Sequence, residues 1–296
     1  MDIRRTAIAA AGIVLLAGCA TAPSKSTGRL RVVTTIGVLA DWARQVGGDR
    51  VEVTSLLTGS ESPHTYEVKP TDVRTIADAR ILFRVGLGLE EWLDGLVANS
   101  GNRTLVMLDA ADGVEVIGAG GGHGHEAGNP HVWLDPQNAR AAVLRIAAEL
   151  ARLDPKAESL YQSRASSYAA RLDSATADLQ ALAAALPDRR FIGYHDAWPY
   201  FNRRFGFEAV ANIEPVPGQE PSARRLADLV ELVRRERVRV VVTEPQLATD
   251  LPNTLARETG AMVVVLNALR ADSAGADPYI GLIEQNVRRL AAALEN

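Results

Sequence analysis

The sequence predicts an α/β protein in which two lobes with parallel sheets are joined by one long rigid helix. Short β-branched runs alternate with helical patterns on both sides of a central stretch rich in Ala, Leu and Arg, which is typical of βαβ units. The central stretch carries a helical pattern from Pro155 to about Leu186. At ~1.5 Å per residue such a helix is a rod of roughly 45–50 Å, long enough to run across two lobes.

Each half of the chain is predicted to contain four strands with helices between them. In the first half we expect strands at Leu30–Thr34, Val51–Leu56, Ile81–Val85 and Thr104–Leu108, and helices near Leu39–Val46, Val73–Ala79 and Glu90–Ala98. In the second half we expect strands at Phe191–Tyr194, Glu208–Ala211, Val238–Thr243 and Met262–Leu266, and helices near Ala197–Phe205, Ala223–Arg235, Thr254–Thr259 and Pro278–Glu295.

Two further helices are predicted between these halves. Residues Pro136–Leu153 form the first, with Asp135 as its N-cap and Pro136 at its first position. Asp154-Pro155 repeats that signal, and the apolar positions that follow lie close to one helical face. We therefore expect an N-terminal lobe over residues 30–153, a linker helix over 154–187 and a C-terminal lobe over 188–296.

The N-terminus carries an export signal. Arg4 and Arg5 precede a short apolar run, which ends in Leu16-Ala17-Gly18-Cys19. That pattern predicts a signal peptide over residues 1–18, too short for a conventional membrane-spanning helix. It resembles the lipobox of bacterial lipoproteins, so Cys19 is the expected lipidation site and residues 19–29 a flexible tether. The protein is expected to be exported and held by a lipid anchor on a bacterial membrane, on the periplasmic or cell-surface side.

Charge and cysteine content exclude some classes of protein. Without residues 1–18 the chain has 30 basic and 35 acidic residues, a net charge of −5, which argues against nucleic-acid binding. Cys19 is the one cysteine, so no internal disulfide can form. We expect a monomer.

Four side chains in loop-like settings are candidate metal ligands. His64 and His131 each follow a proline, His195 follows an apolar run, and Asp277 precedes Pro278. Three neutral imidazoles and one carboxylate suit a borderline-soft divalent ion such as Zn²⁺. The remaining histidines, His123 and His125, lie in a Gly-rich segment over residues 118–128. They are either an accessory loop that captures metal weakly or part of an ordinary surface loop.

These motifs together resemble the cluster A-I solute-binding proteins, the zinc and manganese receptors of ABC importers. The resemblance covers the mature chain in order. The matching blocks are Pro63-His64-Thr65-Tyr66-Glu67, Asn129-Pro130-His131-Val132-Trp133, Tyr194-His195-Asp196-Ala197-Trp198, Glu214–Leu226, Thr243-Glu244-Pro245-Gln246 and Asp277-Pro278-Tyr279. Ser62 departs from the pattern, because an acidic residue is common there.

The resemblance implies two lobes with a metal site in the cleft between them. His64 and His131 would come from the N-terminal lobe, and His195 and Asp277 from the C-terminal lobe. The protein would capture Zn²⁺ outside the cytoplasm and deliver it to the membrane permease of an ABC importer. Members that resemble manganese receptors often carry Glu at the position of His195, so the histidine favours zinc. A manganese or mixed-metal receptor of the same type is the alternative.

Ligating imidazoles usually have their second nitrogen held by a carboxylate or carbonyl. Glu67, Asp196 and Glu244 are the candidates for this role, although such acids are more commonly solvated surface charges. Two other functions stay open: a secreted zinc-dependent hydrolase, and an adhesin or interaction protein that uses the metal structurally. The chain has no His-Glu-x-x-His motif and no Gly-x-Ser-x-Gly motif, so we do not expect an enzyme.

Overall fold

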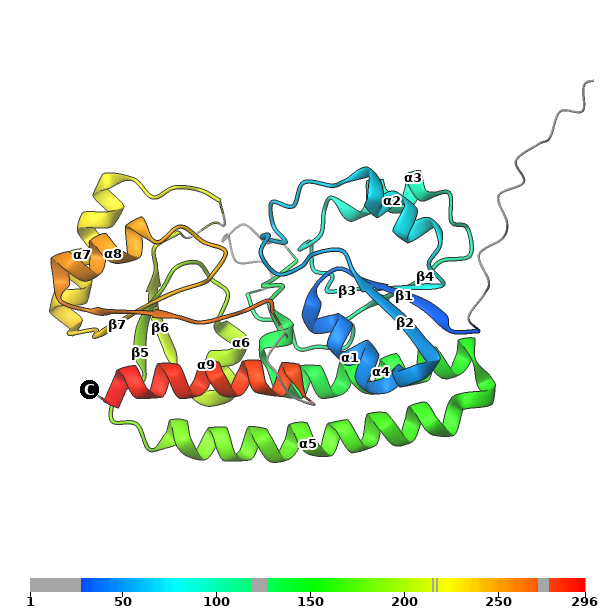
Figure 1. The fold of residues 1–296 in the computed structure, drawn as a ribbon. Helices are drawn as coiled ribbons and strands as arrows, with labels where there is room; N and C mark the ends of the chain where they lie inside the picture. Colours follow the sequence, from blue (N-terminus) through cyan, green and yellow to red (C-terminus); the bar gives the residue numbers. More distant parts are fainter. Residues whose placement is uncertain (1–27, 119–126, 215, 217, 271–276, 296) are drawn as a thin grey trace, which may run out of the picture.

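Two parallel four-stranded sheets lie side by side above a layer of long helices in the computed structural model (Figure 1). The structure describes residues 28–118, 127–214, 216, 218–270 and 277–295. The two parallel sheets and the long helices beneath them confirm the predicted fold class. None of the helices in these ranges is long and apolar enough to cross a membrane.

The N-terminal sheet has the strand order β2-β1-β3-β4. Its strands are β1 (Leu30–Thr34), β2 (Val51–Ser55), β3 (Ile81–Arg84) and β4 (Val106–Asp109), and its helices are α1 (Gly37–Gly47), α2 (Pro70–Ala77) and α3 (Leu93–Ser100). The C-terminal sheet has the order β6-β5-β7-β8. Its strands are β5 (Arg190–Gly193), β6 (Glu208–Asn212), β7 (Val240–Thr243) and β8 (Met262–Val265), and its helices are α6 (Pro199–Phe205), α7 (Ala223–Glu236), α8 (Asp250–Thr259) and α9 (Pro278–Glu295).

Each sheet has a topological switch point, between β1 and β3 in one and between β5 and β7 in the other. In the N-terminal sheet β2 lies on one side of β1 and β3 lies on the other. In the C-terminal sheet β6 and β7 flank β5 in the same way. Ligands in open α/β sheets bind outside the carboxyl ends of strands at such a point. Strand β7, Val-Val-Val-Thr, is buried along its whole length, as expected for a strand covered on both faces.

The long helix α5 (Glu158–Ala184) runs under both lobes, with α4 (Pro136–Leu153) and α9 between it and the sheets (Figure 1). Asp135 accepts a hydrogen bond from the Gln137 amide at the start of α4, as the sequence predicts for an N-cap. The predicted linker helix begins later than expected. Residues Pro155–Ala157 form a 3₁₀ turn before α5, so the proline begins a separate short turn and not the long helix.

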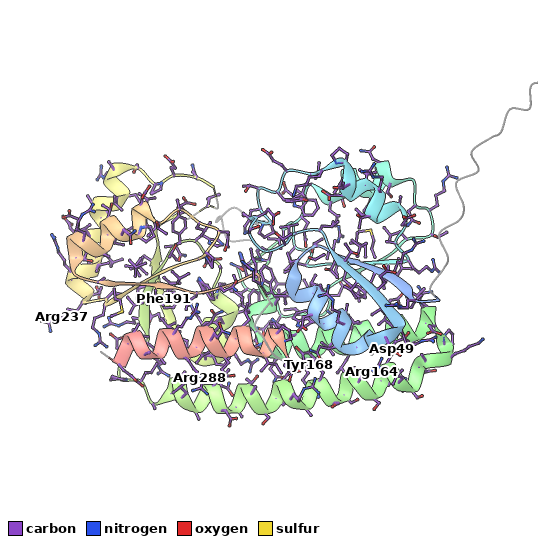
Figure 2. The ribbon with its side chains drawn as sticks, in the orientation of Figure 1. Asp49, Arg164, Tyr168, Phe191, Arg237 and Arg288 are labelled. Atoms are coloured by element: carbon purple, nitrogen blue, oxygen red, sulfur yellow. The ribbon has the colours of Figure 1, made fainter. Side chains whose placement is uncertain are left out.

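Polar contacts fix α5 to the N-terminal lobe. The Arg164 guanidinium donates to the Gly47 carbonyl at 2.8 Å and to Asp49 at 3.0 Å, at the end of the helix shown in Figure 2. Further along, the buried Tyr168 hydroxyl donates to Asp41 of α1 at 3.3 Å. The helix is therefore part of the frame of the molecule and not a free linker.

Candidate metal centre

Three histidines from distant parts of the chain converge at one point. One ligand nitrogen from each of His64, His131 and His195 lies within 4.8 Å of the other two. The Nε2 atom of His131 is 3.3 Å from the Nε2 atoms of both His64 and His195. His131 and His195 are buried, and His64 is partly exposed. Three converging imidazole nitrogens are a suitable donor set for a borderline-soft divalent ion.

The fold explains the position of each histidine. His195 comes two residues after β5, and Glu244 comes directly after the neighbouring strand β7. Both therefore lie at the switch point of the C-terminal sheet. His131 precedes a 3₁₀ turn over Val132–Leu134, and His64 lies in the loop between β2 and α2.

Glu244 holds the far side of the His195 ring. The Nδ1 atom of His195 is 2.9 Å from Oε1 of Glu244, and neither atom has another hydrogen-bond partner among the described residues. Burial lowers the pKa of His195, but nearby carboxylates, Glu244 foremost and then Asp196 and Glu214, outweigh this effect and raise the pKa above its ordinary value. A proton on Nδ1 leaves Nε2 free to bind a metal. Glu244 therefore lies where a residue that orients His195 toward a metal is expected to lie.

Asn129 takes the corresponding position beside His131. Its Oδ1 atom is 3.0 Å from Nδ1 of His131 and also accepts the His131 amide at 3.0 Å. Its amide nitrogen donates to the Asp196 backbone carbonyl at 2.6 Å and to the carboxylate at 3.2 Å. Asp196 therefore acts on His131 through Asn129 and not directly. Sequence reasoning did not assign Asn129 this role, although it stands two residues before a candidate ligand.

Glu67 lies elsewhere. Its side chain is exposed, and none of the described contacts joins it to an imidazole. Its neighbour Tyr66 is buried instead, and the Tyr66 hydroxyl donates to Asp72 at 2.9 Å. In this arrangement Glu67 is therefore not among the described residues that contact the three imidazoles.

The structure also separates Asp277 from the histidines. The Oδ1 atom of Asp277 accepts from Nε of Arg171 at 3.1 Å and from Nη2 at 2.9 Å. Arg171 lies on α5, and Asp277 directly precedes α9. The arginine neutralises the carboxylate that sequence reasoning assigned to the metal. The expected fourth ligand is thus not part of the cluster. His123, His125 and Cys19 lie outside the described residues.

A pocket of about 210 Å³ opens beside the three imidazoles. Residues of the N-terminal lobe, Ser62 to Thr65, form one wall. The opposite wall comes from the C-terminal lobe, and its residues include Tyr194, Glu214, Glu244, Gln246, Ala268 and Leu269. The histidines therefore lie in a cleft lined by both lobes.

Comparison with known proteins decides the family. Residues 32–293 match the family model described as "Zinc-uptake complex component A periplasmic". The chain belongs to this family.

Individual relatives are similar over nearly their whole length. The high-affinity zinc uptake system protein ZnuA of Bacillus subtilis is 28% identical, with 97% of this chain and 96% of that protein covered. The manganese-binding lipoprotein MntA of Halalkalibacterium halodurans is 27% identical, with 95% of each covered. A crystal structure of a ZnuA deletion mutant with zinc bound gives a TM-score of 0.81 at 30% identity, covering 90% of this chain and 99% of that one.

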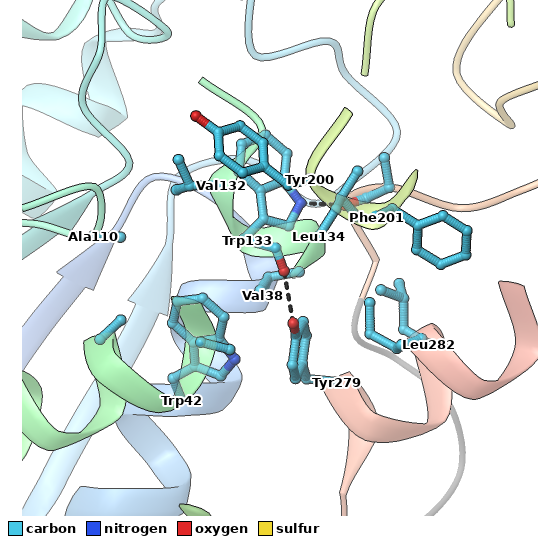
Figure 3. Packing of buried hydrophobic residues seen from close by; sticks show 14 of the residues in the cluster. Val38, Trp42, Ala110, Val132, Trp133, Leu134, Tyr200, Phe201, Tyr279 and Leu282 are labelled. Atoms are coloured by element: carbon cyan, nitrogen blue, oxygen red, sulfur yellow. Dashed lines mark hydrogen bonds between the residues drawn. The ribbon is translucent and has the colours of Figure 1, made fainter. Parts of the chain in front are cut away.

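In this member of the family, hydrogen bonds and an ion pair across the lobe boundary hold the His131 segment. The indole N–H of Trp133 donates to the Ala268 carbonyl at 2.6 Å, and the Tyr279 hydroxyl donates to the Trp133 carbonyl at 2.7 Å (Figure 3). Asp135, fully buried, accepts two hydrogen bonds from the Arg204 guanidinium at 2.6 and 3.0 Å. His131 and the C-terminal lobe are therefore fixed relative to each other.

Proposed function

We propose that the chain captures Zn²⁺ outside the cytoplasm and passes it to the permease of an ABC importer. His64, His131 and His195 would hold the ion. The observation that supports this proposal most directly is the convergence of three imidazole nitrogens within 4.8 Å of one another. Membership in a family of solute-binding receptors, which is not a family of enzymes, supports the same function.

Zinc is favoured over manganese by the donor atoms. Three nitrogen ligands suit Zn²⁺, whereas Mn²⁺ prefers carboxylate, carbonyl and water oxygens. The Glu244 carboxylate, 2.9 Å from His195, faces the Nδ1 atom of that ring and not the point where the Nε2 atoms meet. Relatives are named for zinc and for manganese, so the choice rests on the ligands of this chain.

A zinc-dependent hydrolase is the second candidate, because one feature of the site fits it. With Asp277 paired to Arg171, the cluster found among the described residues consists of three imidazoles. Catalytic zinc sites have three protein ligands and keep the fourth position for water, whereas structural sites have four protein ligands.

The N-terminal segment would place the receptor at a membrane. We propose that residues 1–18 direct export and that Cys19 carries the lipid. Relatives named as lipoproteins support this assignment. The partner would be the permease, with no nucleic-acid partner, and the receptor would work as a monomer.

Competition between metals tests the proposed function. The lipid-free domain from residue 28 is stripped of metal and titrated with Zn²⁺ and Mn²⁺ against a chromogenic chelator. We expect one tight Zn²⁺ per chain, weaker Mn²⁺ binding and an intact circular dichroism spectrum without metal. His131→Ala should remove tight binding, and His123→Ala/His125→Ala is the matched control that should retain it. Ester or peptide hydrolysis that requires the bound zinc would favour the hydrolase instead. Unfolding on metal removal would indicate a structural zinc site.

A further inference from the structure

His64 is the ligand candidate on a loop, and its neighbour Pro63 is held by a tryptophan from the body of the lobe. The indole N–H of Trp92 donates to the Pro63 carbonyl at 2.9 Å. The Pro63 ring fixes its own φ near −65°, so the hydrogen bond and the ring together restrict the peptide that leads into His64. Trp92 itself does not reach the three imidazoles; it contacts the chain one residue before the ligand.

Trp92 is in turn positioned by a buried carboxylate. Glu90, two residues earlier, is 5% exposed. Its Oε1 atom accepts from the Thr35 hydroxyl at 2.7 Å and from the Val85 amide at 2.8 Å, and its Oε2 atom accepts from the Gly86 amide at 3.1 Å. These donors follow β1 and β3, at the switch point of the N-terminal sheet. The Glu90 carboxylate therefore attaches the turn that contains Trp92 to the carboxyl end of the sheet.

A second contact of Trp92 holds the other end of the His64 loop. The rings of Tyr66 and Trp92 lie 4.9 Å apart between centroids. The Tyr66 hydroxyl donates to Asp72 in the first turn of α2. Trp92 thus contacts the chain on both sides of His64, through the Pro63 carbonyl before it and the Tyr66 ring after it. Aromatic pairs at this separation add stabilisation beyond their buried area.

We propose that Trp92 is a positioning residue for His64, which holds the ligand loop so that the imidazole meets those of His131 and His195. This inference deepens the proposed function and rests on it, because it assigns to Trp92 part of the affinity for the divalent ion. Groups that orient a metal ligand typically contribute a factor of about 10 to 100 in affinity. Since Trp92 acts through one neutral hydrogen bond and one ring contact, we expect the lower end of that range.

The variant Trp92→Phe keeps a ring against Tyr66 and removes the N–H that binds the Pro63 carbonyl. We expect Zn²⁺ to dissociate about tenfold faster, measured by stopped-flow transfer to a chelator, with little change in the association rate. Trp42→Phe is the matched control. Trp42 is a fully buried indole of the same lobe, and its Nε1 atom has no hydrogen-bond partner among the described residues. An equal acceleration in both variants would mean a general loss of packing and would overturn the proposal.

A double-mutant cycle with His64→Ala separates positioning from structure. If Trp92 acts through His64, Trp92→Phe should have no further effect on the residual affinity of the His64→Ala protein. An undiminished effect in that background would contradict the proposal.

A measurement without metal keeps the inference separate from the proposed function. In the metal-free protein, hydrogen exchange of the peptide spanning residues 58–69 should be faster in Trp92→Phe than in the wild type and in Trp42→Phe. Unchanged exchange in this peptide would refute the positioning role even if zinc binds. If the wild type does not bind zinc but exchange is faster in Trp92→Phe, the proposed function is refuted. The conclusion that Trp92 restrains the His64 loop then still stands.

Discussion

At the scale of single residues, hydrogen-bonding groups lie behind two of the three imidazoles. Glu244 faces Nδ1 of His195, and Asn129 faces Nδ1 of His131. Each contact sets the orientation of a ring whose other nitrogen points to the shared centre. The two partners differ in charge, so only Glu244 adds a negative charge that favours a bound dication.

Glu244→Gln should change both affinity and pH dependence. We expect zinc affinity at pH 8 to fall about 10- to 100-fold, because the amide orients the ring less well and adds no charge. The carboxylate raises the pKa of His195, so protons compete with metal at a higher pH in the wild type. In the variant, the zinc affinity should begin to fall at a lower pH on acidification. Zinc titrations between pH 5 and 8 would measure both effects, with the exposed Glu67→Gln as a control that changes neither.

Asp277 provides the opposite prediction. Because its carboxylate pairs with Arg171, Asp277→Asn should leave zinc affinity within about twofold of the wild type. The lost ion pair is partly exposed and should cost no more than about 1 kcal/mol of the free energy of unfolding. Isothermal titration and urea unfolding would measure these two quantities. A tenfold or larger loss of affinity would mean that the carboxylate leaves Arg171 to join the metal.

At the scale of elements, buried contacts join the segment between His131 and α4 to the C-terminal lobe. Asp135 caps α4 and also receives the Arg204 guanidinium from α6, the helix that follows His195. The Asp135 carboxylate therefore links α4, which follows His131, to α6, which follows His195. A buried acceptor with several donors is costly to replace, because its partners lose their charge compensation.

Asp135→Asn should therefore destabilise the protein strongly. We expect a loss of roughly 2–4 kcal/mol in the free energy of unfolding, since Arg204 remains partly accessible to water and recovers part of the cost. Urea unfolding of the metal-free protein would measure it. Asp173→Asn removes an exposed carboxylate paired with Arg140 and is the matched control, with an expected change of about 0–1 kcal/mol. Equal losses in the two variants would contradict the structural role assigned to the Asp135–Arg204 ion pair.

The elements themselves follow closely from local sequence patterns. β-branched runs and the Asp-Pro signals predict the strands and the beginning of α4, because these depend on neighbouring residues. The fate of Asp277 could not be predicted in this way. Its partner Arg171 lies 106 residues earlier, and an aspartate before a proline looks the same whether it binds a metal or an arginine. Trp92 escaped notice for the same reason, because its acceptor is a backbone carbonyl 29 residues away.

At the scale of the whole molecule, the two lobes share one frame. Helix α5 underlies both lobes, α4 and α9 pack between it and the sheets, and the Trp133 indole and Tyr279 hydroxyl join the lobes at the cleft (Figures 1 and 3). Such a frame limits large hinge motion, so binding and release are expected to involve the loops around the pocket.

Small-angle scattering would test this expectation. The radius of gyration of the metal-free and zinc-bound domains should agree within about 1 Å, the scale of backbone change in pre-organised complexes. A larger contraction on zinc addition would mean that the lobes close around the ion.

The central claim is that one zinc ion is bound by three imidazoles drawn from both lobes, and X-ray absorption at the zinc edge tests it most directly. The lipid-free domain loaded with one equivalent of Zn²⁺ should show three imidazole nitrogens at about 2.0–2.1 Å and one further light atom. Each of His64→Ala, His131→Ala and His195→Ala, measured with enough Zn²⁺ to occupy the weakened site, should show one imidazole fewer in that shell. A wild-type shell with fewer than three imidazoles, or one unchanged by these substitutions, would contradict the account.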